Sequence, residues 1–135
     1  MSVKIAPRAE GLNAEFYAEC ARGRLAFQRC SDCGTWRHPP RTMCARCGSW
    51  NWQWQPSSGQ GRIYTWTVTH QPLHPAFADA IPYAVVVVEL DEGVRLVSGL
   101  RELAVGDLRL DLPVEVILEP VSEGMALPFF RPRSS

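Results

Sequence analysis

The sequence has no long apolar run, no excess of charge of either sign and no internal repeat. Its longest uninterrupted apolar run spans residues 84–88, which is far too short for a membrane-spanning helix. Residues 1–16 carry no apolar segment either, so we expect neither a signal peptide nor a membrane anchor. These absences predict a cytoplasmic protein with no membrane partner, whose thiols stay reduced.

Charge and length restrict the class of protein further. The 135 residues include 14 Lys and Arg and 14 Asp and Glu, which gives a formal net charge of zero. Proteins dedicated to nucleic acids usually carry a basic excess, because neutralised phosphates supply most of their affinity, so we expect no nucleic-acid partner. With 46% hydrophobic residues, a chain of this length can build one core, as a single domain or a domain with a small module.

Four of the five cysteines stand in two C-x-x-C-G knuckles. The glycine after each knuckle, Gly34 or Gly48, tolerates a positive φ and lets backbone N–H groups approach the sulfur. Two such knuckles complete a tetrahedron of thiolates, which suits Zn²⁺ at about 2.3 Å per Zn–S bond. We predict a structural zinc ion that cross-links the chain, with iron as the alternative for the same ligands. The predicted ligands are Cys30, Cys33, Cys44 and Cys47.

Other uses of these thiols fit the sequence less well. A thioredoxin-like redox site uses one C-x-x-C that opens a helix within a βαβ unit, and no such unit surrounds either knuckle. Disulfides between such near neighbours would be strained, and a reducing compartment would not protect them. The fifth cysteine, Cys20, stands apart within a predicted helix, where we expect it to act as a small buried hydrophobic residue.

The first half of the chain predicts a helix followed by a ribbon. Residues 12–22 place apolar side chains on one helical stripe, and Gly23 is a suitable C-terminal stop. The stripe would pack on its own domain or dock on a partner, and the pattern does not distinguish the two. Residues 24–29 are expected to form the first ribbon strand. In the segment 50–54 three tryptophans alternate, which predicts that they share one side of a strand and pack between the ribbon and the next module.

The second half of the chain has the period of β-strands. Residues 57–61, SSGQG, are typical of a hinge between modules. Beyond the hinge, residues 83–90 are apolar on both faces, which predicts a central, covered strand, and 101–112 are expected to hold a short helical turn. The predicted strands are 62–69, 83–90, 94–100, 114–119 and 125–130.

Five short strands fit a small closed barrel of the OB type. The predicted fold is therefore mainly β, with an N-terminal helix, a rubredoxin-like zinc ribbon and a five-stranded OB-fold barrel. We place a leader and helix at 1–23, the ribbon at 24–56 and the barrel at 57–132.

Several features in one order carry a family resemblance. After the helix, the two knuckles and the barrel pattern come the segments QPLHPAF at 71–77, IPY at 81–83, ELDEGVR at 89–95 and LPFFRP at 127–132. The sequence resembles the family known as domain of unknown function 35, in which a rubredoxin-like zinc ribbon is joined to an OB-fold associated with acyl-CoA. The match runs from about Leu12 to Pro132, and although a ribbon alone is generic, this combination is specific.

The resemblance implies a non-catalytic subunit that supports a thiolase-like enzyme acting on acyl-CoA. Family members pair with thiolases, with acyltransferases, and with lipid-transfer-protein-like aldolases that cleave a steroid side-chain β-hydroxyacyl-CoA by a retro-aldol step. The catalytic residues then belong to the partner, and we expect a heterotetramer of two plus two subunits. The residues expected to bind the partner are Leu12, Phe16, Tyr17, Phe129 and Phe130.

A group of arginines lies around the knuckles. Arg37, Arg41 and Arg46 would contact the phosphates of CoA, because the guanidinium fork matches phosphate oxygens. They would equally form a solvated face or pair with acidic groups on a partner, and the sequence leaves these roles open.

Two other functions remain as alternatives. A free-standing acyl-CoA enzyme would use His70, His74 and Asp79 for acid–base chemistry, although these side chains also fit a polar loop without a catalytic role. A module that binds single-stranded nucleic acid would stack bases on its aromatic side chains, although the neutral net charge counts against this alternative. The side chains concerned are Trp50, Trp52, Trp54, Tyr64 and Trp66.

Overall fold

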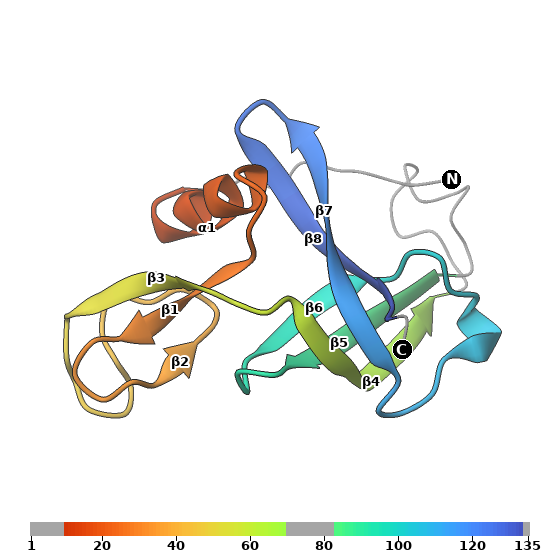
Figure 1. The fold of residues 1–135 in the computed structure, drawn as a ribbon, viewed down its shortest axis with the longest axis horizontal. Helices are drawn as coiled ribbons and strands as arrows, with labels where there is room; N and C mark the ends of the chain where they lie inside the picture. Colours follow the sequence, from red (N-terminus) through yellow and green to blue (C-terminus); the bar gives the residue numbers. More distant parts are fainter. Residues whose placement is uncertain (1–9, 70–82, 134–135) are drawn as a thin grey trace.

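The structure is a computed structural model, and it describes residues 10–69 and 83–133. A helix, a three-stranded sheet and a five-stranded sheet follow one another along the chain (Figure 1). The predicted class is therefore confirmed: mainly β, with an N-terminal helix, a small ribbon and a five-stranded barrel. Within the described residues, no helix has the length and apolar character needed to cross a membrane.

The helix and the ribbon come first. The helix α1 spans Leu12–Ala21 and begins after Gly11, whose φ is +58°. The ribbon is an antiparallel sheet of order β2-β1-β3. Its strands are β1 (Ala26–Cys30), β2 (Trp36–Arg37) and β3 (Trp52–Pro56).

The barrel follows with strand order β6-β5-β4-β7-β8, all neighbours antiparallel. Its strands are β4 (Gln60–Thr69), β5 (Tyr83–Leu90), β6 (Arg95–Gly99), β7 (Pro113–Ser122) and β8 (Met125–Pro132). The predicted helical turn is a single 3₁₀ turn at Val105–Asp107.

The sheet closes where its two outer strands meet. A parallel bridge joins Leu100 to Phe130, and the backbone N–H of Arg101 donates to the Phe130 carbonyl at 2.8 Å. Beyond this point β6 and β8 diverge. β7 pairs with β4 at residues 113–115 but with β8 as far as Ser122, so the β7–β8 hairpin projects past the barrel as an arm beside α1 (Figure 1).

The strand β5 is paired on both sides but covered on one face. Val86 and Val88 point into the barrel and are 0% exposed, whereas Val85 is 40% exposed. The prediction of a central strand is confirmed by its place between β4 and β6, and the prediction that both faces are covered is wrong. An all-valine segment shows no alternation, so the sequence did not reveal the open face.

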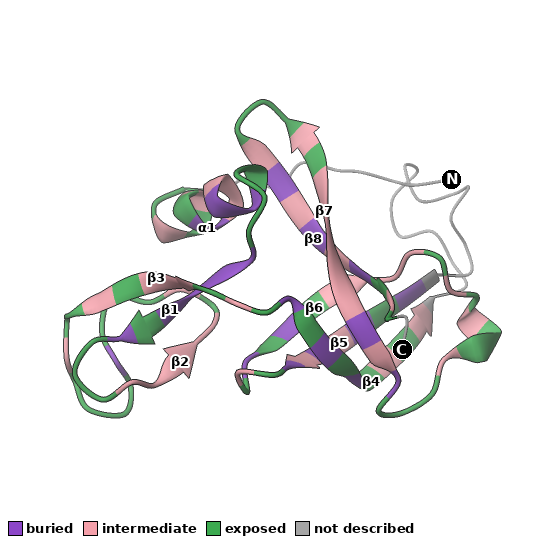
Figure 2. Cartoon of the chain, viewed as in Figure 1, coloured by how far each residue is buried: buried purple, intermediate pink, exposed green. Residues whose placement is uncertain are grey.

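One apolar core runs from the helix and ribbon into the barrel. Phe16 of α1 and Phe27 of β1 belong to the same buried cluster as Ile63, Val86 and Phe130 of the barrel. In Figure 2 buried segments, in purple, occur on α1, on β1 and on the barrel strands. The position of the ribbon is thus tied to the barrel through the helix.

The tryptophans of the ribbon divide into two groups. The rings of Trp52 and Trp54, both on β3, meet edge to face at 5.2 Å between centroids. Trp54 also lies 6.5 Å from the ring of Phe16 and donates to the carboxylate of Glu15 at 3.2 Å. Trp50 precedes the strand and is 69% exposed, so the prediction that all three tryptophans pack on one side of a strand is wrong for Trp50.

Candidate functional site

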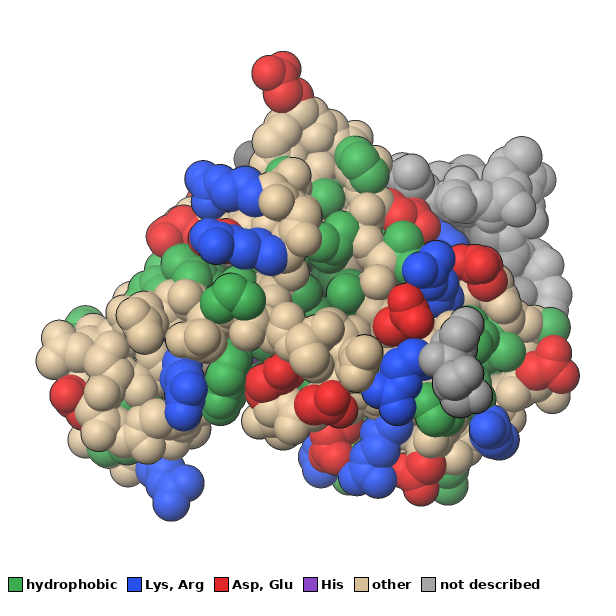
Figure 3. Space-filling model, viewed as in Figure 1, with side chains coloured by type: hydrophobic (Ala, Val, Ile, Leu, Met, Phe, Trp, Pro, Cys, Tyr) green, Lys and Arg blue, Asp and Glu red, His purple; other side chains and the backbone are tan. Residues whose placement is uncertain are grey.

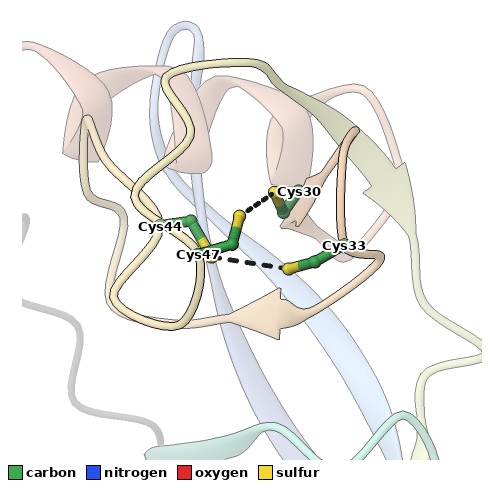
Figure 4. Close-up of side chains that lie close together, drawn as sticks. All are labelled: Cys30, Cys33, Cys44 and Cys47. Atoms are coloured by element: carbon green, nitrogen blue, oxygen red, sulfur yellow. Dashed lines mark hydrogen bonds between the residues drawn. The ribbon is translucent and has the colours of Figure 1, made fainter.

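Four thiols converge in the ribbon. Cys30 and Cys33 come from the end of β1 and the turn after it, and Cys44 and Cys47 come from the long loop between β2 and β3 (Figure 4). The Sγ–Sγ distances of the pairs Cys30–Cys47 and Cys33–Cys44 are both 3.6 Å. All four sulfur atoms lie within 4.8 Å of one another.

These distances fit a tetrahedral metal site. Zinc–sulfur bonds of about 2.3 Å place the sulfurs of an ideal tetrahedron about 3.8 Å apart, because the edge of a tetrahedron is about 1.6 times its centre-to-corner distance. The observed separations bracket that value. Four thiols also form the donor set that zinc prefers in structural sites, and they leave no coordination position for water or substrate.

The two knuckles have the same local geometry. In each, the glycine after the second cysteine has a positive φ, +77° at Gly34 and +78° at Gly48. The N–H of that glycine donates to the carbonyl of the first cysteine of its knuckle, at 3.0 and 2.8 Å respectively. The turn needs the left-handed backbone conformation, which glycine adopts without steric cost, so the predicted positive φ of these glycines is confirmed.

A polar bridge joins the first knuckle to the second. The carboxylate of Asp32 accepts hydrogen bonds from the hydroxyl of Ser49 and, at 3.3 Å, from the side-chain amide of Asn51. These two bonds lower the pKa of Asp32, chiefly through Ser49. The backbone N–H of Ser31 adds a bond of 2.9 Å to the carbonyl of Asn51. These bonds join the two cysteine pairs in addition to any shared metal ion.

A buried glutamine anchors the loop that carries the second knuckle. The side chain of Gln28 is 0% exposed, and its Oε1 accepts from Nε of Arg37 and from the backbone N–H of Arg41, both at 2.7 Å. Arg37 also donates to the carbonyl of Arg41 at 2.9 Å. The guanidinium of Arg37 is thus engaged within the ribbon, which favours a structural role over the predicted phosphate contact. Arg41 and Arg46 are exposed.

The thiols differ in how readily they lose a proton. Backbone N–H groups three residues further along lower the pKa of Cys30 and of Cys44. The backbone amide of Ser49 lowers the pKa of Cys47, but burial and hydrogen bonds to the other three sulfurs outweigh it and raise that pKa to about 12. Since the thiolate is the form that ligates a metal, metal binding at these four thiols releases protons.

A groove separates the helix and ribbon from the barrel. It encloses about 430 Å³ and is bounded by α1, by the segment after β2, and by the diverging strands β6 and β8. Its lining includes Tyr17, His38, Pro39, Val97 and Phe129. In Figure 3 hydrophobic side chains also follow the β7–β8 arm, with charged groups gathered to either side.

The imidazole of His38 lies between aromatic rings at the base of this groove. Its ring centroid is 4.8 Å from that of Phe16 and 5.3 Å from that of Phe27. Burial lowers the pKa of His38 to about 4, and its Nδ1 has no hydrogen-bond partner among the described residues. The side chain is therefore neutral at physiological pH and contributes to an apolar surface.

The predicted partner-binding residues separate into buried and accessible ones. Phe16 is 3% exposed and Phe130 is 0% exposed, because both pack in the core of this chain, although Phe16 also lines the groove. Leu12, Tyr17 and Phe129 are half-buried, and the last two line the groove. The sequence prediction missed Val97, which is 66% exposed at the edge of the groove, because alternation does not show which face of an outer strand stays uncovered.

Three of the predicted residues have no structural description. His70, His74 and Asp79, assigned to acid–base chemistry in one alternative, lie outside the described residues.

Comparisons with known proteins agree with this architecture. The model of the ChsH2 rubredoxin-like zinc ribbon domain matches residues 18–52, and that of the ChsH2 C-terminal OB-fold domain matches 54–119. A DUF35 domain-containing scaffold protein of Methanothermobacter thermautotrophicus is 31% identical over 103 residues, which cover 76% of this chain and 77% of the relative. The chain belongs to the DUF35 family. Since the zinc ribbon match includes both knuckles, the cofactor of this DUF35 chain is a structural zinc ion at the four thiols.

Longer relatives and solved structures match as well. A probable enoyl-CoA hydratase alpha subunit of Thermomonospora curvata is 40% identical over 120 residues, which cover 89% of the DUF35 chain and 37% of the relative. The chain thus spans about a third of the length of this relative. The solved structure entitled Ltp2-ChsH2(DUF35) aldolase is 38% identical, with a TM-score of 0.85 and coverage of 94% of this chain and 98% of that one. A DUF35 protein of Sulfolobus solfataricus, 12% identical with a TM-score of 0.56, shares the fold.

Proposed function

We propose that this DUF35 chain is a non-catalytic subunit that binds and supports a thiolase-like enzyme acting on acyl-CoA. The partner that we favour is a lipid-transfer-protein-like aldolase that cleaves a steroid side-chain β-hydroxyacyl-CoA by a retro-aldol step. The observation that carries the proposal is the similarity, over 98% of its length, to the chain solved as part of the Ltp2-ChsH2(DUF35) aldolase. The hydratase alpha subunit of Mycobacterium tuberculosis that matches at 31% identity acts on a steroid-derived acyl-CoA according to its name, which supports the substrate class.

The metal site supports a role in assembly. A zinc ion held by four thiolates has no open position at which to polarise a carbonyl or activate water. It stabilises the ribbon instead, and through α1 the ribbon is packed against the barrel. We therefore assign the catalytic residues to the partner.

The groove and its margin form the partner surface in this proposal. Tyr17 from α1, Phe129 from β8 and Val97 from β6 present half-buried or exposed apolar side chains around it, and Leu12 extends the surface along the helix. Apolar surface of this kind on a small protein favours contact with another protein.

The remaining parts of the proposal concern the ligand and the assembly. Arg41 and Arg46 are the exposed arginines of the ribbon that we assign to CoA phosphates, since Arg37 is engaged elsewhere. We propose a cytoplasmic complex of two plus two subunits, in which segments 1–23, 24–56 and 57–132 of this chain act as helix, ribbon and barrel.

A matched pair of substitutions tests the partner surface. Val97 is 66% exposed at the groove and Leu110 is 64% exposed away from it, so both positions tolerate a charged side chain in the isolated chain. An aspartate buried against an apolar partner costs at least about 2 kcal/mol, or roughly 30-fold in Kd. We expect Val97→Asp to weaken binding to a co-expressed Ltp2-type aldolase by that factor, and Leu110→Asp to leave the Kd unchanged in calorimetric titration.

The same preparation tests the proposal as a whole. If the wild-type chain does not co-elute with the aldolase in gel filtration, or if aldolase turnover is the same with and without it, the chain is not a supporting subunit of this enzyme. Equal Kd values for the two aspartate variants would leave the subunit role intact and remove the groove from it.

A further inference from the structure

The connector between ribbon and barrel is held by a distant turn, chiefly through the carboxylate of Glu92, to which that of Asp91 adds one longer bond of 3.5 Å from the hydroxyl of Ser58. Glu92 lies in the turn between β5 and β6, whereas Ser57 and Ser58 lie between β3 and β4. The hydroxyl of Ser57 donates to Oε1 of Glu92 at 2.6 Å, and the backbone N–H of Ser58 donates to Oε2 at 2.9 Å. The two carboxylate oxygens thus accept hydrogen bonds from consecutive residues of the segment 57–61, whose composition predicts a hinge.

The rest of the connector is fixed to its surroundings as well. On the ribbon side the N–H of Ser57 donates to the carbonyl of Leu25 at 2.7 Å, and on the barrel side the carbonyl of Gly59 accepts from Val116 at 2.8 Å. Gly59 has a φ of +76°, and a Cβ there would lie 2.7 Å from a methyl carbon of Val116. The connector therefore passes between the two sheets in one defined conformation.

Two attachments then determine how the ribbon sits on the barrel. One is α1, which packs against β1 of the ribbon and against β7 and β8 of the barrel, and is the main bridge between these strands in the described part of the chain. The other is the connector. The groove lies between the two modules, with Tyr17, His38 and Pro39 on one wall and Val97 and Phe129 on the other. Any rotation of the ribbon about α1 would change the separation of these walls.

We propose that Glu92 is a positioning residue that clamps the connector and so fixes the angle between the zinc ribbon and the barrel. A charge-assisted pair of hydrogen bonds is stronger and more directional than the neutral bonds that the remaining groups would make. Without this carboxylate the connector keeps its backbone bonds to Leu25 and Val116, and we expect the ribbon to turn about α1 to a greater extent. The expected effect of this clamp on partner binding rests on the proposed function, whereas the clamp itself does not.

Residual dipolar couplings of the zinc-loaded chain test the clamp without any partner. In the wild type we expect the amide couplings of ribbon and barrel to fit one alignment tensor. In Glu92→Ala the couplings of ribbon and barrel should no longer fit one tensor, and the ribbon should show a lower degree of order. In Ser57→Ala the fit to one tensor should worsen in the same direction. The matched control is Glu123→Ala, because Glu123 is an exposed glutamate in the other hairpin turn, between β7 and β8. It should fit one tensor as the wild type does.

The outcomes separate the clamp from the proposed function. A variant counts as folded if it binds one zinc per chain and the amide chemical shifts of its barrel core are unchanged. If Glu92→Ala does not meet this criterion, Glu92→Gln replaces it, since glutamine keeps one acceptor oxygen. A single tensor with the wild-type ribbon angle in the folded variant overturns the proposal. In the complex we expect Glu92→Ala to raise the aldolase Kd on the order of 10-fold, since a smaller fraction of molecules has the binding-competent groove. Changed couplings with an unchanged Kd would support the clamp and count against the groove as partner surface.

Discussion

Replacing one zinc ligand by serine tests how far the metal holds the ribbon together. Structural zinc contributes on the order of 10 kcal/mol in small metal modules. The strands of the ribbon have five, two and five residues, so they supply little cross-strand stabilisation without it. We expect Cys44→Ser to reduce the zinc content from one equivalent to near zero and to expose the ribbon amides to hydrogen exchange. The barrel should stay folded, because its five strands share their own buried side chains.

Cys20 provides the control, because it is 1% exposed, as Cys44 is, but lies outside the cage. Burial raises the pKa of Cys20 to about 12, so this thiol stays protonated. Serine at this position buries a hydroxyl in an apolar site, which costs about 1–3 kcal/mol of global stability without loss of metal. Elemental analysis measures the zinc content of both variants, and hydrogen exchange measures the protection of their ribbon and barrel amides. Retention of one zinc and of ribbon protection in Cys44→Ser, or loss of zinc in Cys20→Ser, would refute the reasoning.

Three further predictions concern stability and metal retention. Since the pKa of His38 is lowered to about 4, the unfolded chain takes up a proton between pH 6.5 and 4 that the folded chain does not. The free energy of unfolding should fall by up to about 3 kcal/mol as the pH drops through this window. In urea titrations, the free energy of unfolding of His38→Phe should decline less steeply with falling pH than that of the wild type. In Gly61→Ala the new Cβ would overlap the carbonyl oxygen of Glu89, so we expect the free energy of unfolding in urea to fall by about 2–3 kcal/mol. The control is Gly106→Ala, whose Cβ meets no atom within 4 Å, and it should lower the free energy of unfolding by less than about 0.5 kcal/mol. Asp32→Ala should lower zinc affinity by about 10–100-fold in a chelator competition, because it removes the bridge between the knuckles, and an unchanged affinity would contradict that role.

Two features of the molecule are predictable from the sequence for the same reason: their determinants are local. Each cysteine knuckle is set by a few consecutive residues, and its glycine adopts the positive φ that the spacing requires. Each barrel strand has its own period of two or its own apolar run, so the five strands and the intervening 3₁₀ turn lie close to their predicted residues. The convergence of the two knuckles on one point then follows from the donor chemistry of zinc.

The polar contacts that fix the geometry of the site have no such local signal. Gln28 occurs in a short apolar strand, and its burial depends on a loop that begins ten residues later. Asp32 and Glu92 stand in turns, where acidic residues are common for solubility alone. Their partners are 17 and 34 or more residues away, so only the folded chain shows that one carboxylate joins the knuckles and the other holds the connector.

The Phe129–Phe130 pair illustrates what a family resemblance leaves unresolved about individual side chains. Successive side chains of a strand point to opposite faces, so two adjacent phenylalanines cannot both lie on one surface. Phe130 pairs with Val116 on the face that closes the barrel, whereas Phe129 pairs with Ile117 on the outer face. The guanidinium of Arg101 lies 3.8 Å from the ring of Phe129. Arg101 also pairs with the carboxylate of Glu119, to which its Nε donates at 2.7 Å, so a partner that reaches Phe129 meets a guanidinium whose charge is already balanced within the chain.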